Sequence, residues 1–414
     1  MTTPYTTYII GGGISSLSTA IYLSKDDRNI SIHESSKNAG GRCRSFNDSV
    51  LNTTIDNGNH LILGANKNAL NFIKLIDSDN YFNKITSSAF NFIDLNNKNE
   101  WKISNLYKLH KEIPGKNIDN LIDLLKIIKS PKGKTVFDHY NNNLYECFWR
   151  PLAISIMNTP CEIASASMFT NVIRTILKAG NKGLTAYIPK NNWDESLISP
   201  SIKTLENGKS NFEINYNSLV TKLDIDNNRV IKIHTNKKEI LLNENDNVVL
   251  ALPPHAVNKL LPDIDTPKEY HTIVNAHFRL PNNYENHILG VIGGTADWLF
   301  FRKTNNEHII SSTTSAADEL AKLSDHEIAK LIWKDISSCL NIDLSHMPIN
   351  RIIKEKRATF SCTDDNEKLR PNTKTDISNL FLAGDYTNTY LPATIDGAIL
   401  SGRKAAEIII NRKC

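Results

Sequence analysis

Three short groups near the N-terminus combine the residue types that bind a nucleotide diphosphate. The first is the glycine run Gly11-Gly12-Gly13, which follows an apolar stretch and precedes Ser15 and Ser16. Glycine lets the backbone turn sharply from a strand into a helix while amide N–H groups stay free to face an anion. Ser16 takes the place of the third glycine in a GxGxxG pattern, and serine is also small. The pattern predicts a strand, a phosphate-binding turn and a helix that runs to about residue 25.

A carboxylate and a guanidinium follow this turn at a spacing that indicates FAD. Glu34 ends the next predicted strand, 29–34, and lies 23 positions after the first glycine (34 − 11 = 23). A carboxylate at this spacing accepts hydrogen bonds from the adenosine ribose. Gly40-Gly41-Arg42 follows shortly after and brings backbone and a cation to the diphosphate. A domain that binds NAD alone has no need of this last element, so the three groups together predict FAD.

A second glycine turn, Gly384-Asp385, lies near the C-terminus. Asp385 on a glycine corner is suited to accept a hydrogen bond from a ribityl hydroxyl. A helix beginning near Pro392 would direct its positive N-terminal end at the cofactor. Taken alone, this turn is equally well explained as a helix cap. We assign cofactor binding to Gly11, Gly13, Ser15, Ser16, Glu34, Ser35, Gly41, Arg42, Asn57, Gly58, Val220, Gly384, Asp385, Pro392, Ala393 and Thr394.

Between these turns the chain leaves the cofactor fold twice. Apolar periodicity predicts helices over 68–76, 118–129 and 325–340, and strands over 219–225, 248–252, 273–280, 288–292, 298–303, 308–314 and 349–361. The strand 248–252 is continuously apolar and ends in prolines, as a buried parallel strand does. We expect an α/β fold with a discontinuous Rossmann-like FAD-binding domain of the glutathione-reductase type (1–65, 215–265 and 355–414). An inserted α+β substrate-binding domain would comprise 66–214 and 266–354, with the flavin ring at the boundary.

Composition excludes several classes of protein. The 414 residues, 40% of them hydrophobic, are enough to bury a large core, and a net charge of +4 does not indicate nucleic acid. The six cysteines have neither CxxC nor zinc spacing, so we expect reduced thiols and no bound metal. We predict no signal peptide and find no apolar run of the ~20 residues that a membrane span requires. The expected location is the cytoplasm.

Both turns resemble those of the flavin amine oxidase and phytoene desaturase superfamily, which implies an amine oxidase-like fold. Five internal stretches narrow the resemblance: 56–60 (DNGNH), 148–152 (FWRPL), 158–160 (NTP), 355–360 (EKRATF) and 384–398. These stretches resemble the hydroxysqualene dehydroxylases, FAD enzymes of bacterial hopanoid pathways, over nearly the whole chain. The resemblance implies that reduced FAD converts hydroxysqualene to squalene. No cysteine lies near the second turn, so we expect the FAD to be bound non-covalently.

Removal of an allylic hydroxyl needs a group that protonates or hydrogen-bonds the leaving oxygen. The candidates are His60 first, then Asp56, Arg150, Lys356 and Tyr386. His60 has an alternative structural role, a hydrogen bond to Asp56 or to the backbone of the cofactor domain. Arg150 and Arg357 are alternatively ion-paired scaffold residues, and the sequence does not show whether Lys356 points inward. An isoprenoid substrate also predicts a long apolar pocket with few polar groups.

Two partners remain open. The chain has no second strand-GxGxxG-helix unit, so electrons would come from NAD(P)H in the same pocket or from a redox protein. The segment 116–134 combines Leu121, Ile122, Leu124, Leu125, Ile127 and Ile128 with five lysines. It is either an amphipathic helix on the inner face of the cytoplasmic membrane or a core helix with solvated lysines.

Three rival functions use the same motifs. A carotenoid-type or phytoene-type desaturase would run electrons in the opposite direction, from an isoprenoid chain to oxidised FAD. A flavin amine oxidase is less consistent with the internal stretches. A flavin-free lipid escort protein has a related fold, but the intact Glu34, Arg42 and Asp385 argue against it.

Overall fold

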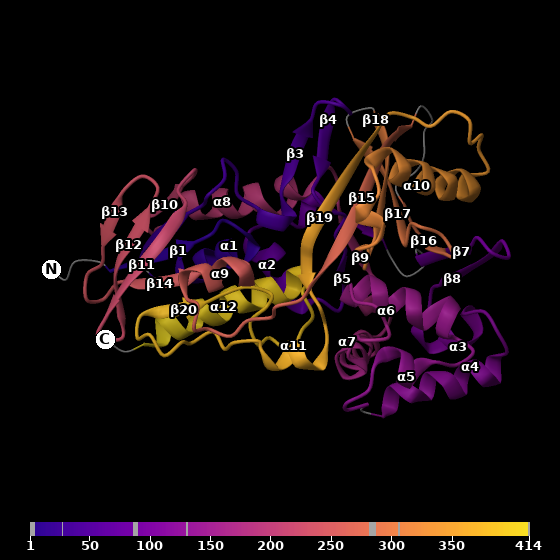
Figure 1. Ribbon diagram of the computed structural model, residues 1–414, viewed down its shortest axis with the longest axis horizontal. Helices are drawn as coiled ribbons and strands as arrows, with labels where there is room; N and C mark the ends of the chain where they lie inside the picture. The colour runs from indigo at the N-terminus through magenta and orange to yellow at the C-terminus, as the bar shows by residue number, and fades with distance from the viewer. Residues whose placement is uncertain are drawn as a thin grey trace.

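The computed structural model describes residues 5–26, 28–85, 90–129, 131–280, 287–304 and 307–412. Figure 1 shows an elongated molecule. A parallel sheet lies at the end that carries both termini, and a larger mixed sheet lies at the other end.

The parallel sheet has five strands, and all of its neighbouring pairs run in the same direction. Its order is β10 (Phe212–Asn215), β2 (Asn29–His33), β1 (Thr6–Ile10), β14 (Asn247–Leu250) and β20 (Leu380–Leu382). Helices α1 (Ile14–Leu23) and α12 (Ile395–Asn411) pack against each other beside it. The predicted α/β fold and the buried strand at 248–252 are therefore confirmed. The sequence did not indicate β10, because its four residues are too few and too polar to stand out.

The strand expected at 219–225 is β11 (Val220–Asp226). The residues just before β11 lie beside the end of β2, since Ser218 N donates to Glu34 O over 2.8 Å. Strand β11 itself is not part of the parallel sheet. It forms a separate antiparallel sheet with β12 (Arg229–Thr235) and β13 (Glu239–Leu241).

The mixed sheet has seven strands and is built from the inserted segments. Its order is β19 (Asn350–Phe360), β15 (Tyr270–Leu280), β18 (Glu307–Thr314), β17 (Trp298–Thr304), β16 (His287–Ile292), β7 (Phe90–Asp94) and β8 (Asn99–Ile103). Helix α10 (Asp325–Leu340) covers one face and shares a buried apolar cluster with β15. The antiparallel β17–β18 pair confirms the two strands expected at 298–303 and 308–314, and residues 305 and 306 between them lie outside the described residues.

A group of short helices covers the other face of this sheet (Figure 1). It comprises α3 (Leu109–Glu112), α4 (Asn117–Leu124), η4 (Leu125–Ile128), α5 (Val136–Tyr140), α6 (Arg150–Met157) and α7 (Ala166–Lys178). The helix expected at 118–129 is thus α4 continued by η4. Helix α2 (Lys67–Leu75), which packs against α12, is the helix expected at 68–76.

The two-domain division stays a proposal, and two of its expected boundaries need adjustment. Strand β19 pairs with β15 from Asn350 to Phe360, so a boundary at 355 would cut through a strand of the mixed sheet. Strand β10 begins at Phe212, before the expected boundary at 215. We place these boundaries outside β10 and β19, because hydrogen-bonded strands do not divide between two folding units.

Candidate active site

The glycine run turns the chain from β1 into α1 and leaves space in front of the helix. Gly11 has φ of +104°, and a Cβ there would lie 2.5 Å from Ala251 O, so the fold itself needs glycine at this position. Gly13 is the N-cap of α1, and an added Cβ would meet no described heavy atom within 4 Å. Gly11 is thus fixed by packing, whereas Gly13 faces open space at a helix N-terminus, where a phosphate binds well.

The Gly40-Gly41-Arg42 group folds back onto this turn. Gly40 N donates to Gly12 O over 2.8 Å, and Gly40 forms a parallel bridge with Gly13. The nearest atom to a Cβ added at Gly41 would be Gly13 Cα, at 3.4 Å. Two motifs that are separate in sequence therefore form one backbone cradle.

Glu34 lies at the carboxyl end of β2, beside the cradle. Its Oε2 accepts from Gly12 N over 2.6 Å, and its Oε1 accepts from Ser36 N over 2.7 Å and Ser35 Oγ over 3.2 Å. These bonds hold the carboxylate in place, and its partial exposure leaves it accessible to a ligand hydroxyl. Val220 is buried at the start of β11, close to the same strand end.

An ion pair joins the N-terminal and the C-terminal glycine motifs. Arg42 Nη2 lies 2.8 Å from Asp385 Oδ1, and Arg42 Nη1 donates to Ala358 O over 2.6 Å. Burial disfavours the charge, but the attraction of Asp385 outweighs it and raises the pKa of Arg42. Gly384 N donates to Ser401 Oγ of α12 over 2.8 Å, which fixes the corner that presents Asp385. The sequence named both charged residues but did not predict their contact.

The C-terminal helix is capped beside this corner. Thr394 Oγ1 accepts from Gly397 N over 3.1 Å, so α12 begins at Ile395, just after Pro392 and Ala393. The open space at Gly13, the Glu34 carboxylate and the Arg42–Asp385 pair offer room at a helix N-terminus, a hydrogen-bond acceptor and a cation, which are groups that bind a nucleotide cofactor. The residues present therefore fit a flavin.

The loop 56–60 joins this cofactor site to the seven-stranded sheet. Asp56 is buried, accepts from Ser45 Oγ over 2.6 Å and from Trp193 N over 3.0 Å, and forms an ion pair with Arg302 of β17. Both carboxylate oxygens are thus engaged. Asp56 connects β4 (Thr53–Asp56) to β17, which fits a scaffold role better than that of a free acid.

Asn57 and His60 of the same loop contact the seven-stranded sheet and the Gly40-Gly41-Arg42 group, respectively. Asn57 Nδ2 lies 3.1 Å from Glu355 Oε2, and Asn57 O accepts from Asn275 Nδ2 over 3.3 Å. His60 Nε2 lies 3.4 Å from Arg42 O. Burial lowers the pKa of His60, so the neutral imidazole is favoured. A carbonyl only accepts, so Nε2 carries the proton and Nδ1 remains an acceptor.

One row of directly paired residues crosses all seven strands of the mixed sheet. From β19 to β8 the row reads Ile353, Asn275, Thr313, Trp298, Gly290, Phe92 and Trp101. Paired residues share a face, and six interstrand steps of ~4.8 Å give the row a length of about 29 Å.

After the apolar Ile353 at the β19 edge, the row changes from polar to aromatic along its length, and we call Asn275 and Thr313 its polar end. At the polar end, Thr313 Oγ1 donates to Asn275 Oδ1 over 2.9 Å and accepts from Asn59 Nδ2 over 3.1 Å. At the aromatic end, Phe92 stacks on Trp101 with centroids 4.1 Å apart and meets Trp298 edge-on at 5.4 Å. The polar end is therefore the one beside the loop 56–60 and the cofactor cradle.

Comparison with known proteins identifies the family. Residues 14–410 match the family model of flavin containing amine oxidoreductases. The hydroxysqualene dehydroxylase of Zymomonas mobilis is 34% identical over 98% of this chain and 99% of its own length. That of Sinorhizobium fredii is 33% identical over 99% of both chains. The chain belongs to the hydroxysqualene dehydroxylase family. It is therefore a flavin-dependent oxidoreductase, and the predicted resemblance is confirmed.

More distant relatives support the fold of this family. A phytoene desaturase of Glycine max is 24% identical over 48% of this chain and 39% of its own length. An oxidoreductase structure from Methanosarcina mazei has a TM-score of 0.77 at 15% identity, covering 97% of this chain and all of that one. A putrescine oxidase structure has a TM-score of 0.71 at 11% identity, with coverage of 99% and 100%. At such low identities the structural likeness establishes the fold alone.

The other catalytic candidates belong to segments outside the loop 56–60. Lys356 and Arg357 are exposed in a bulge, where β19 advances four residues while β15 advances two. Arg150 is half exposed and lies 3.8 Å from Glu146, which fits the ion-paired alternative. Tyr386 is buried, and burial raises its pKa far above the usual range. Its hydroxyl has no hydrogen-bond partner within the described part of the chain.

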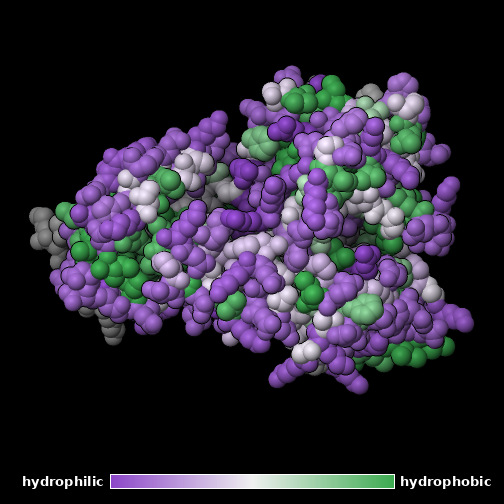
Figure 2. Space-filling model, in the orientation of Figure 1, coloured by the Kyte–Doolittle hydropathy of each residue, from purple (hydrophilic) through white to green (hydrophobic). Residues whose placement is uncertain are grey.

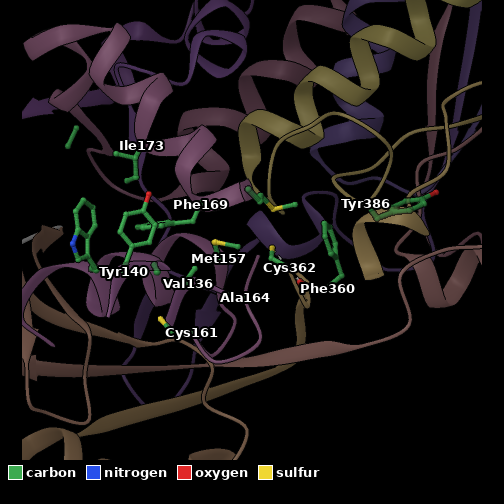
Figure 3. Packing of buried hydrophobic residues seen from close by; sticks show 14 of the residues in the cluster. Val136, Tyr140, Met157, Cys161, Ala164, Phe169, Ile173, Phe360, Cys362 and Tyr386 are labelled. Atoms are coloured by element: carbon green, nitrogen blue, oxygen red, sulfur yellow. Dashed lines mark hydrogen bonds between the residues drawn. The ribbon is translucent and has the colours of Figure 1, made fainter. Parts of the chain in front are cut away.

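Figure 3 shows Tyr386 at one end of a buried cluster, beyond Phe360 and Cys362 as seen from Tyr140 and Phe169. It is thus part of the apolar core as well as a neighbour of Asp385.

Four residues at the site were not predicted: Asn275, Arg302, Glu355 and His255. Asn275 and Arg302 lie in strands, where a single polar residue forms no motif. His255 follows Pro253 and Pro254 at the end of β14, and its Nδ1 is buried without a partner among the described residues. Burial and the nearby Arg357 lower the pKa of His255. Its place at the carboxyl end of a parallel strand was a usable signal.

The described residues contain neither a candidate metal site nor a candidate membrane-spanning helix. No group of three histidine, cysteine, aspartate or glutamate residues in those ranges could hold a metal ion. None of the helices in the same ranges is long and apolar enough to cross a membrane.

Proposed function

We propose that this chain reduces hydroxysqualene to squalene, with non-covalently bound FAD. The observation that carries the proposal is the row across the seven-stranded sheet. A hydroxylated isoprenoid needs hydrogen-bonding groups at one point and apolar walls elsewhere, and the row offers this arrangement with its polar end beside the cofactor cradle. The full-length relatives named hydroxysqualene dehydroxylase support the same substrate.

FAD would be held by the residues that form the cradle. Gly13 and Gly41 leave room for the diphosphate, Glu34 faces the ribose, and the Arg42–Asp385 pair lies toward the flavin. Cys43 adjoins Arg42, but burial raises the pKa of its thiol to about 12. The thiolate that a covalent flavin link requires is therefore disfavoured.

The reaction breaks one C–O bond and forms one C–H bond, with a proton leaving in the water molecule. The flavin, when bound and reduced, supplies the hydride. The chain must hold the hydroxyl and assist its departure. Asn275 Nδ2 at the polar end donates one N–H to Asn57 O, so its second N–H is the donor that we propose for this task. The aromatic end would hold the isoprenoid chain and exclude water; there Trp298 Nε1 donates to Ser155 Oγ of α6 over 2.7 Å.

His60 remains the proposed proton donor. It lies in the loop that joins the cradle to the sheet, unlike Lys356 and Arg150. Its lowered pKa means that it would act as an acid only after it gains a second proton near the substrate. Asp56 is proposed to position this loop through Arg302, and Tyr386 to close the apolar side beyond Asp385.

A desaturase is the second candidate, supported by the distant phytoene desaturases. A hydrocarbon substrate makes no use of a buried polar end, which favours the dehydroxylase. The amine oxidase and the flavin-free escort protein have no specific observation in their favour. We further propose that electrons arrive from NAD(P)H or a redox protein, and that the protein works at the cytoplasmic face of the membrane.

The test is a paired assay of the purified holoenzyme. With dithionite and hydroxysqualene, we expect squalene by mass spectrometry. With oxidised flavin and squalene, we expect no desaturated product. Desaturation in the second arm together with no squalene in the first would contradict the dehydroxylase and support the desaturase.

A further inference from the structure

The α4–η4 segment presents an apolar face to solvent. Its exposed residues are Ile118, Leu121, Ile122, Leu125 and Ile128, each between 48% and 74% exposed. The spacing of i, i+3, i+4, i+7 places the first four on one side of the helix, and Ile128 extends this line. We call these five residues the outer face. Figure 2 shows hydrophobic surface at the lower right, where Figure 1 places α4.

The inward side of α4 includes two buried polar residues beside Leu124, although a surface helix usually turns apolar residues inward. Asn120 is 1% exposed and donates to His110 O and Ile113 O over 3.1 and 3.2 Å. Asp123 is also buried, and burial raises its pKa. A soluble protein gains stability when apolar residues face inward. The exposed outer face therefore indicates that an apolar partner covers it when the protein functions.

Lysines surround the outer face. Residues 106–134 contain seven lysines and three carboxylates, a net charge of +4 (7 − 3) that equals the net charge of the whole chain. Two of the three carboxylates, Glu112 and Asp123, are turned inward, and Glu112 accepts from Ser104 N over 2.7 Å. Lys111, Lys116 and Lys129 are exposed. An apolar face within a cationic rim is complementary to a bilayer that contains anionic lipid.

The outer face also lies over the apolar interior that leads to the proposed substrate row. Ile113 and Ile127, on the inner side of this segment, belong to the same buried cluster as Phe92 of the row and Tyr386 beside the cofactor site. The outer face and the proposed substrate row are therefore linked by one continuous apolar core.

We propose that α4–η4 is a docking surface for an anionic lipid bilayer, with the outer face in the acyl boundary and the lysines at the headgroups. The choice of a bilayer over a protein partner rests on charge complementarity and, for its purpose, on the proposed isoprenoid substrate. The sequence pattern had included Leu124 and Ile127 in such a face. The structure turns these two inward and adds Ile118.

The experiment measures flotation of the full-length holoenzyme with vesicles of phosphatidylcholine, with or without phosphatidylglycerol. We expect flotation that needs the anionic lipid, and at least a tenfold lower bound fraction for Leu121→Ser/Leu125→Ser/Ile128→Ser. The matched control is Leu219→Ser/Leu241→Ser, which removes leucines that are 50% and 72% exposed near the far end of the molecule. Flavin content verifies that each variant folds.

Wild-type protein that stays in solution, or a triple variant that floats as well as wild type, would overturn the docking surface. So would a soluble dimer that the triple variant dissociates. Turnover of detergent-solubilised hydroxysqualene separates this proposal from the proposed function. Flotation without turnover would support the docking surface and reject the proposed function. Turnover without flotation would support the proposed function and reject the docking surface.

Discussion

At the residue scale, the site depends on contacts between residues that are far apart in sequence. Arg42 and Asp385 form an ion pair across 343 positions, and Asp56 pairs with Arg302 across 246. Glycine spacing and the Glu34 register predicted the cofactor turn because each is a local property of the backbone. Pairings such as these are set by tertiary packing and have no local signal, so the sequence named the residues but not their partners.

His60 provides the first prediction at this scale. A positioned acid contributes ~10²–10⁴-fold to the rate, so His60→Ala should lower squalene formation by about 10²-fold while flavin content stays unchanged. The measurement is single-turnover product formation with flavin absorbance as the fold control. His60→Gln retains a hydrogen-bond donor and should recover part of the loss if positioning matters. A variant that keeps its flavin and the wild-type rate would show that His60 is not the acid.

At the scale of elements, glycines divide into those that the fold requires and those that the ligand requires. A Cβ at Gly402 of α12 would lie 2.3 Å from Ser15 O of α1, whereas a Cβ at Gly13 would meet open space. Helices α1 and α12 therefore pack at Gly402, whereas we expect the cofactor to approach at Gly13. The GxGxxS context predicts a ligand-binding role for Gly13, whereas the packing role of Gly402 depends on a tertiary contact with α1 and has no local signal.

The pair Gly13→Ala and Gly402→Ala tests this division. Gly13→Ala should unfold within about 0.5 kcal/mol of wild type as apoprotein, yet bind FAD at least tenfold more weakly. Gly402→Ala should destabilise the apoprotein by about 1–3 kcal/mol, because overpacking forces the helices apart. Thermal unfolding of the apoproteins and FAD titration provide the two readouts. Normal FAD affinity in Gly13→Ala would place the diphosphate elsewhere.

Strands and helices of the inserted segments were predictable where periodicity was strong. Helix α10 has the expected limits, and β15 to β19 appear where alternation placed them. The short strands β5 (Ile62–Leu63) and β9 (Ala186–Pro189) were not predicted, since two to four residues carry no period. The bulge that exposes Lys356 also has no signal in the sequence, because it arises from the register between β19 and β15.

At the scale of the whole molecule, we expect one sheet to bind the cofactor and the other to bind the substrate. The parallel sheet presents the flavin cradle at the carboxyl ends of β1, β2, β14 and β20. The row of paired residues on the seven-stranded sheet runs from its polar end, beside the loop 56–60, to its aromatic end. The loop 56–60 connects them, so the reacting carbon is expected where this loop meets the row.

In the proposed reaction, the reduced flavin of this chain passes a hydride to hydroxysqualene. The most direct measurement is anaerobic mixing of flavin-reduced holoenzyme with hydroxysqualene, with flavin absorbance and product mass followed together. We predict flavin reoxidation at the rate at which squalene appears, with one squalene per flavin. Reoxidation without squalene, or a flavin that stays reduced, would contradict the account.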